Sequence, residues 1–169
     1  NNTDMTNFFM LESAYDGLSI SVAAVYPENH PKAVLQISHG MCGCKERFEP
    51  VMNFLSDNGI ACIASDHRGH GESIKDIRDL GYFYSGGYKA LVDDIRSVTY
   101  WGQKEFPSLP YYLLGHSMGS LCARVYASSF GAELSGLILC GTAQLPKGLD
   151  FAINTLDQVV DKFGPKTVN

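Results

Sequence analysis

The chain of 169 residues is 45% hydrophobic and 18% charged, and it contains 17 glycines, a composition typical of one globular domain. Its 13 Lys and Arg residues against 18 Asp and Glu residues give a net charge of -5, and without a basic cluster this argues against nucleic-acid binding. No apolar run approaches the roughly 18 to 20 residues that span a bilayer, and the first residues lack the basic start and apolar stretch of a signal peptide. We therefore expect a soluble, cytoplasmic protein.

The first part of the chain predicts an antiparallel hairpin, because two strand-like runs, 8–13 and 18–28, flank the turn at Tyr15-Asp16-Gly17. Short apolar runs then alternate with segments of helical spacing. The predicted strands are 33–40, 60–66, 110–117 and 134–143, and the predicted helices are 48–59, 86–107 and 118–131. This alternation predicts an α/β fold with a mostly parallel sheet, helices on both faces and the hairpin at one edge.

The five cysteines form an odd set without framework spacing, and three of them stand in apolar segments. Cys42-Gly43-Cys44 has the look of a redox or metal-binding pair, but a zinc site needs about four ligands and the chain has no second cysteine pair. We expect reduced thiols and no metal site.

The most informative motif is G-H-S-M-G, residues 115–119. Gly115 and Gly119 flank Ser117 where a predicted strand turns into a helix, an arrangement that lifts a serine Oγ above the sheet. A Cβ at either glycine would crowd such a turn, and the helix start aims backbone N–H groups at a developing oxyanion. Ser117 is the candidate nucleophile, and the alternative is an inert turn.

Two other loops follow predicted strands. His39-Gly40-Met41 follows the strand at 33–40, and a backbone N–H from such a loop is the expected partner of the Met118 N–H in an oxyanion hole. Met41 is the candidate donor, and the alternative is a plain turn. The segment SDHRGHGES, residues 65–73, is a polar, glycine-rich loop at the carboxyl end of a strand, where open α/β sheets bind ligands.

In this order and spacing, H-G at 39–40, D-x-R-G-H-G-x-S at 66–73 and G-H-S-M-G at 115–119 resemble the α/β-hydrolase superfamily. The resemblance is to the branch of monoacylglycerol lipases, lysophospholipases and serine aminopeptidases, and it extends over about residues 8–143. It implies Ser117 as nucleophile, Met41 and Met118 as oxyanion donors, and no metal or organic cofactor.

The resemblance also implies that Asp66, Arg68 and His70 shape a loop beside the site without reacting. Relatives often carry a small residue and then glycine after H-G, whereas Met41 and Cys42 stand here. A narrower acyl pocket is therefore expected.

The resemblance raises a difficulty, because an α/β-hydrolase places its acid and then its histidine after the serine. All five histidines precede Ser117: His30, His39, His67, His70 and His116. His116 is a poor base because neighbouring side chains diverge at a sharp turn. His39 and His70 lie on the correct side of the sheet but would need an orienting carboxylate, and His30 and His67 are interpreted as structural or solvated.

The acidic residues after the serine, Glu133, Asp150, Asp157 and Asp161, receive no role. We expect the chain to be an N-terminal portion of a longer hydrolase whose last strands are absent from it, with residues 1–143 as part of the core and 144–169 as the start of a cap. A helix predicted at 150–164 packs on the core in the favoured interpretation and covers an acyl chain in the alternative.

Three functions remain open. The favoured one is a serine ester hydrolase that acts on a lipid-like substrate, a lysophospholipid or monoacylglycerol, through an acyl-enzyme on Ser117, with transient membrane-surface contact through the cap. A serine peptidase of the same branch shares the motifs. A fold without catalytic activity that binds a ligand or a partner protein is the third.

Overall fold

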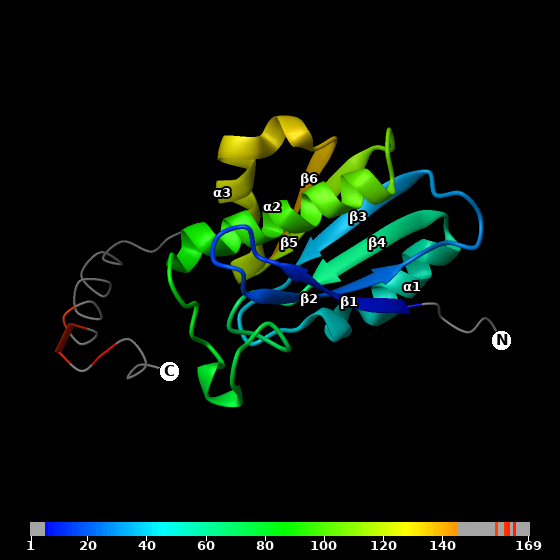
Figure 1. The fold of residues 1–169 in the computed structure, drawn as a ribbon. Coiled ribbons are helices and arrows are strands. Elements are labelled where there is room, and N and C mark those ends of the chain that lie inside the picture. Colours follow the sequence, from blue (N-terminus) through cyan, green and yellow to red (C-terminus); the bar gives the residue numbers. More distant parts are fainter. Residues whose placement is uncertain (1–5, 145–157, 159–160, 163, 165–169) are drawn as a thin grey trace.

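The computed structural model describes residues 6–144, 158, 161, 162 and 164. Within this part of the chain the strands form one six-stranded sheet in the order β1-β2-β4-β3-β5-β6 (Figure 1). The strands are β1 Thr6–Glu12, β2 Ser19–Val25, β3 Ala33–Ser38, β4 Ile60–Ser65, β5 Tyr111–His116 and β6 Gly136–Cys140. The helices are α1 Glu49–Asp57, α2 Gly87–Glu105 and α3 Met118–Phe130, with 3₁₀ turns η1 Lys45–Phe48, η2 Ile77–Asp79 and η3 Gly131–Glu133.

The predicted N-terminal hairpin is confirmed. β1 pairs antiparallel with β2, from Thr6 opposite Val25 to Glu12 opposite Ser19, and β2 pairs antiparallel with β4. β2 is shorter than the predicted strand 18–28, and Pro27 gives the reason, because proline has no N–H to donate to a ladder. The hairpin therefore forms one edge of the sheet.

The other four strands are parallel, as predicted. β3 lies between β4 and β5, and β6 extends the sheet beyond β5. Parallel strands that follow one another through helices end at the same edge of a sheet. The loops after β3, β4 and β5 therefore leave the sheet side by side (Figure 1), and these loops carry the three motifs.

Alternation along the strands divides the core into two layers, because neighbouring residues of a strand point to opposite faces. In β4, Cys62 and Ala64 pack under Met52 of α1, whereas Ala61 and Ile63 face Val98 of α2. A third cluster joins α2 and α3 over β5. One helix thus covers one face of the sheet and two helices cover the other (Figure 1).

The edge strand β6 is apolar and exposed. Leu137, Ile138 and Leu139 keep 36%, 45% and 38% of their surface accessible, and among the described strands only β5 pairs with β6. An unpaired apolar edge of this kind favours association with another strand. The predicted cap helix at 150–164 lies outside the described residues, apart from a few isolated positions.

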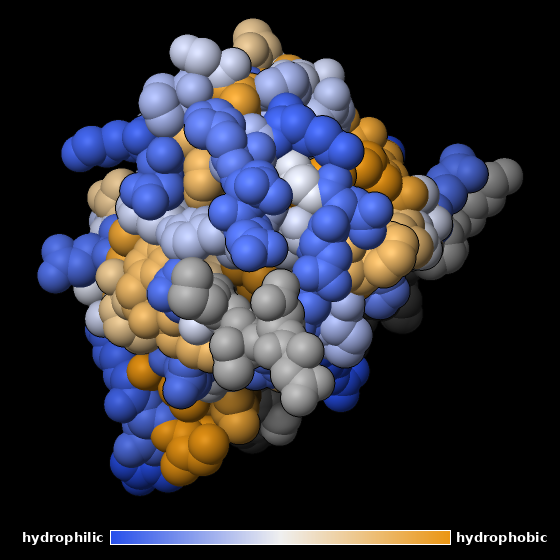
Figure 2. All heavy atoms as spheres, turned by 90° about the vertical axis from the view of Figure 1, so that its right-hand side faces the viewer, coloured by the Kyte–Doolittle hydropathy of each residue, from blue (hydrophilic) through white to orange (hydrophobic). Residues whose placement is uncertain are grey.

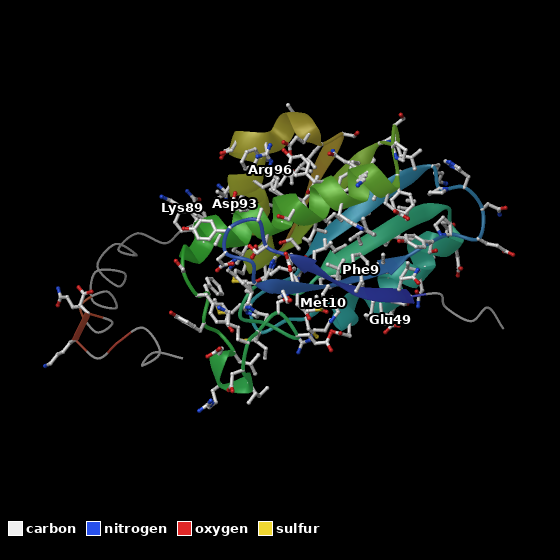
Figure 3. The ribbon with its side chains drawn as sticks, in the orientation of Figure 1. Phe9, Met10, Glu49, Lys89, Asp93 and Arg96 are labelled. Atoms are coloured by element: carbon white, nitrogen blue, oxygen red, sulfur yellow. The ribbon has the colours of Figure 1, made fainter. Side chains whose placement is uncertain are left out.

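The outer surface is mixed. From the right-hand side of Figure 1, hydrophilic residues cover most of the face and hydrophobic residues form separate patches (Figure 2). Alternation along β1 packs Phe9 on Trp101 of α2 and leaves its neighbour Met10 half-exposed (Figure 3). Lys89, Asp93 and Arg96 follow one another on the outer side of α2 (Figure 3). None of the described helices is long and apolar enough to span a membrane.

Candidate active site

Ser117 occupies the turn between β5 and α3, and its backbone is strained. Its φ of 53° and ψ of -120° lie in a region that non-glycine residues avoid, at a cost of about 1–3 kcal/mol that is typically found at functional sites. Two hydrogen bonds hold this turn: the Ser117 N–H donates to the Cys140 carbonyl (2.9 Å), and the Ser120 hydroxyl donates to the Ser117 carbonyl (2.6 Å). The Ser117 side chain is exposed, and its hydroxyl has no hydrogen-bond partner within residues 6–144.

The two flanking glycines allow the start of α3 to lie directly against β3. A Cβ on Gly119 would stand 2.1 Å from the Ser38 carbonyl oxygen and 2.5 Å from that of His39. A Cβ on Gly115 would stand 2.4 Å from the Gly119 carbonyl oxygen. Since atoms cannot approach so closely, only glycine permits this packing, which brings the Ser117 turn beside the loop that follows β3.

The loop after β3 approaches the serine through Gly40. A Cβ on Gly40 would lie 3.0 Å from the Ser117 Cβ, and the next residue, Met41, is 68% exposed. Within residues 6–144 the N–H groups of Met41 and Met118 donate to no acceptor. Two free backbone donors beside a strained serine are what an oxyanion hole requires.

A pocket of about 210 Å³ opens between these two loops. Among the described residues it is lined by His39, Gly40, Met41, Gly43, Arg47, Phe48, His116 and Ser117. Burial lowers the pKa of His39 to about 4, so its ring is neutral near pH 7. Arg47 is the only Lys, Arg, Asp or Glu residue among these lining residues. Within the described part of the chain its guanidinium has no hydrogen-bond or ion-pair partner.

Three histidine rings, His39, His67 and His70, pack against one another beside the pocket, which His39 lines. The ring centroids of His39 and His67 are 4.2 Å apart, and those of His39 and His70 are 5.3 Å apart. Both nitrogens of His39 are occupied: Nε2 accepts the His67 N–H (2.9 Å) and Nδ1 contacts the Gly40 carbonyl (2.7 Å). Burial also holds the pKa of His67 well below its usual value. The neutral rings of His39 and His67 therefore link the loops after β3 and β4.

Because the rings of His39 and His67 are buried in the neutral form, the fold is expected to lose stability in mild acid. A pKa near 4 for His39 in the folded state against about 6.5 in the unfolded chain means that the unfolded state binds the proton first. The stabilisation is complete above about pH 6.5 and disappears as the pH falls toward 4, a loss of about 3 kcal/mol for His39 alone. Urea unfolding at several pH values between 4 and 7.5 measures it, with His39→Gln as the comparison. An equally steep decline in that variant would contradict the assignment to His39.

The first part of the loop after β4, residues 66–70, is buried. Asp66 and Arg68 are 0% exposed and His70 is 6% exposed. Asp66 accepts hydrogen bonds from the backbone N–H groups of Lys45 (2.7 Å) and Glu72 (2.9 Å). None of the three lines the pocket, and their role in shaping the site without reacting stays a prediction.

Arg68 extends this network to two other parts of the fold. Its guanidinium donates to Asp94 of α2 (2.7 Å) and to Asp16 in the hairpin turn (3.1 Å). It also donates to the Ser13 hydroxyl and to the carbonyls of Phe83 and Ser85. The buried Arg68 side chain therefore connects the loop after β4 to the hairpin, to α2 and to the segment before α2.

No described histidine makes a hydrogen bond to Ser117. His39 has both nitrogens occupied, and the Nδ1 of the buried His70 contacts the Arg68 carbonyl (3.2 Å). His116 is exposed and its ring lies against Phe48, but it makes no hydrogen bond to Ser117. His30 precedes β3 and lies at the opposite end of that strand from the pocket.

Among the described acidic residues that follow Ser117, none lines the pocket. Glu133 is in η3, beyond the far end of α3, where it pairs with Arg96. Asp161 is an isolated exposed position, and Asp150 and Asp157 lie outside the described residues.

Two charged residues of this region carry no sequence signal. Lys45 lies in a stretch that looks like an ordinary polar loop, and Asp94 is one of two adjacent aspartates on a helix. Both are buried because their partners are Asp66 and Arg68, which are distant in the sequence. Tertiary contacts alone identify them.

Comparison with known proteins shows the family and the fold of the chain. The family described as serine aminopeptidase, S33, matches residues 29–168, which is most of the chain. The chain belongs to this family. Its fold is that of the α/β-hydrolases: it superposes on a thermostable carboxyl esterase from Bacillus coagulans with a TM-score of 0.82 and 29% identity, over 93% of this chain and 51% of the esterase.

Two proteins similar in sequence to this chain are lipases. It is 29% identical to a monoacylglycerol lipase of Mycolicibacterium smegmatis, over 82% of the chain and 48% of the lipase. It is 32% identical to the monoglyceride lipase of Homo sapiens, over 67% of the chain and 36% of the lipase. The chain therefore spans between about a third and a half of the length of these relatives.

Proposed function

We propose that the intact protein is a serine ester hydrolase in which Ser117 attacks the substrate carbonyl and forms an acyl-enzyme. The observation that carries the proposal is the strained and exposed Ser117 at the start of α3, with a hydroxyl that has no described partner. The N–H groups of Met41 and Met118 then donate to the oxyanion that develops on the carbonyl oxygen. Water releases the acyl group in a second step.

The proposal includes a base and an acid contributed by a part of the intact protein outside these 169 residues. His39, His67 and His70 are held by other contacts, and His116, although it lines the pocket, makes no hydrogen bond to Ser117. The partial coverage of the relatives, 48% and 36% of their lengths, leaves room for such residues. Without a base, catalysis would fall by orders of magnitude.

Arg47 favours an ester whose polar part is anionic. Its guanidinium lines the pocket and has no partner in the described part of the chain, and arginine binds phosphate with paired, charge-assisted hydrogen bonds. The two similar lipases point to a fatty acyl ester of glycerol. A lysophospholipid combines both properties, so we place it ahead of a monoacylglycerol.

An aminopeptidase is the second candidate, because the family description names one. An aminopeptidase must hold the free ammonium group of its substrate, which calls for a carboxylate near the pocket. The described lining offers Arg47 instead, and a guanidinium repels an ammonium group. Ester hydrolysis therefore agrees better with the charge of the site.

The test of the proposal is labelling of the intact protein by a fluorophosphonate, together with hydrolysis of lysophosphatidylcholine. We expect wild-type protein to be labelled, and Ser117→Ala to lose labelling and more than about 1,000-fold of the hydrolysis rate. Ser129→Ala, at an exposed serine of the same helix, is the matched control and should behave as wild type. Equal behaviour of the wild type and Ser117→Ala would show a binding protein or a different nucleophile.

The substrate preference has its own test in Arg47→Gln. We expect KM for lysophosphatidylcholine to rise about 10-fold or more, since a hydrogen bond to a charged group contributes about 1.5–3 kcal/mol. KM for a monoacylglycerol of the same chain length, which has no phosphate, should change less than about twofold. A similar rise for both substrates would remove Arg47 as the residue that selects the head group.

A further inference from the structure

Lys45 stands at the start of η1, and its ammonium group is completely buried. Nζ donates to the carboxylates of Glu46 (2.6 Å), Asp66 (2.9 Å) and Glu72 (2.9 Å). Burial by itself would lower the pKa of Lys45, but these three hydrogen bonds raise it well above its usual value. Because an ammonium has three donors, each has an acceptor and Lys45 stays charged.

The three carboxylates would otherwise suit a metal ion. One oxygen of each of Glu46, Asp66 and Glu72 lies within 4.8 Å of the other two. The Lys45 Nζ is within hydrogen-bond distance of all three, so the ammonium occupies the position a cation would take. The cluster is therefore an ion pair network whose cation is Lys45 itself, with Asp66 buried and Glu46 and Glu72 reaching the surface.

This network joins the loop after β3 to the loop after β4. Lys45 contacts Asp66 twice, through its backbone N–H (2.7 Å) and through Nζ (2.9 Å). A second connection between the same loops lies earlier in the chain, where the His67 N–H donates to the His39 Nε2 (2.9 Å). Residues 40–44 lie between these two connections.

The segment 40–44 forms a strained turn. The Gly43 N–H donates to the Gly40 carbonyl (3.0 Å), and Cys42 has a φ of 54°, which is unfavourable for a residue with a Cβ. Met41 and Cys42 are exposed, so packing does little to hold them. A strained backbone persists only where its surroundings fix it, and here the fixed points are the two ends.

We infer that Lys45 is a positioning residue for the oxyanion hole, because its ion pair with Asp66 fixes the end of segment 40–44 and so directs the Met41 N–H toward Ser117. The inference rests on the proposed function, since it assigns Lys45 a task in the reaction only where the Met41 N–H holds an oxyanion. A purely structural ion pair would change the stability of the fold and leave turnover by the folded protein unaltered.

The experiment is steady-state hydrolysis of a p-nitrophenyl fatty acyl ester by intact Lys45→Met, at a temperature where circular dichroism shows it folded. We expect kcat to fall about 10- to 100-fold, as for a weakened oxyanion donor, and KM to change less than about threefold because the pocket is intact. Lys89→Met removes an exposed lysine of α2 and should keep the wild-type kcat.

A wild-type kcat in folded Lys45→Met overturns the inference, and so does a loss that appears in KM alone. Should Lys45→Met not fold, Asp66→Asn applies the same test, because it removes the anionic partner and keeps an oxygen for the Lys45 N–H. Unchanged kcat in folded Asp66→Asn likewise overturns the inference. Failure of the proposed function looks different, since wild type would then hydrolyse no ester, or Ser117→Ala would match it.

Discussion

Replacement of Gly119 by alanine is expected to lower the free energy of unfolding by about 3 kcal/mol, the upper end of the usual cost of overpacking. The added Cβ would stand 2.1 Å from the carbonyl oxygen of Ser38, so either β3 or the start of α3 must move. Either movement would disturb the candidate site, because β3 leads into the loop with Met41 and Ser117 immediately precedes α3. We therefore also expect fluorophosphonate labelling of Ser117 to be lost.

Urea unfolding and labelling of the folded fraction measure the two effects of Gly119→Ala. Gly131→Ala is the matched control, because Gly131, just beyond the other end of α3, has a φ of -58° and its nearest neighbour for an added Cβ is 3.8 Å away. Its stability should remain within about 0.5 kcal/mol of wild type. A folded Gly119→Ala protein that is labelled at the wild-type rate would show that the close contact of α3 with β3 is not needed for the site.

Replacement of Arg68 by methionine is expected to cost about 3–5 kcal/mol, the effect of removing one partner of a buried ion pair. Arg68 is 0% exposed, and Asp94 opposite it is almost as deeply buried. Burial raises the pKa of the Asp94 carboxyl although Arg68 opposes this shift, so loss of the guanidinium leaves the carboxylate without compensation. The hairpin turn at Asp16 and the segment at 83–85 lose their common anchor at the same time.

Thermal or urea unfolding of Arg68→Met measures this loss. Arg78→Met is its control, because the Arg78 side chain is 85% exposed and pairs only at the surface with Asp76. Exposed pairs contribute less than about 1 kcal/mol, so Arg78→Met should be close to wild type. Equal effects of the two substitutions would show that the buried network around Arg68 does not stabilise the fold.

The secondary structure and the position of the candidate nucleophile follow from local sequence. Short apolar runs alternating with helical spacing predict the parallel sheet, and the hairpin turn at Tyr15-Asp16-Gly17 predicts its antiparallel edge. The predicted and observed elements differ at their ends. The strand predicted at 18–28 stops at Val25, because Pro27 has no N–H to donate to the neighbouring strand. Ser117 is predictable because the strand, the two glycines and the helix are all within a few residues of it.

The burial of charged residues in the loops at the carboxyl edge of the sheet cannot be predicted from local sequence. SDHRGHGES and the stretch around Lys45 have the composition of solvated loops, yet Lys45, Asp66, His67 and Arg68 are buried. A charged side chain can be buried only if a partner of opposite charge or a set of hydrogen bonds meets it. Arg68 pairs with Asp94, which is 26 residues away in the sequence, and Lys45 pairs with Asp66, which is 21 residues away.

By itself, the sequence determined the α/β alternation, the turn that presents Ser117, and the fact that no histidine follows that serine. These depend on residue types and short spacings, which a linear chain displays directly. Only the tertiary structure decided which charged residues lie in the interior, how the loops after β3 and β4 are joined, and that Arg47 lines the pocket without a partner among the described residues. The physical reason is that the burial of a charge is set by partners that folding brings together from distant parts of the chain.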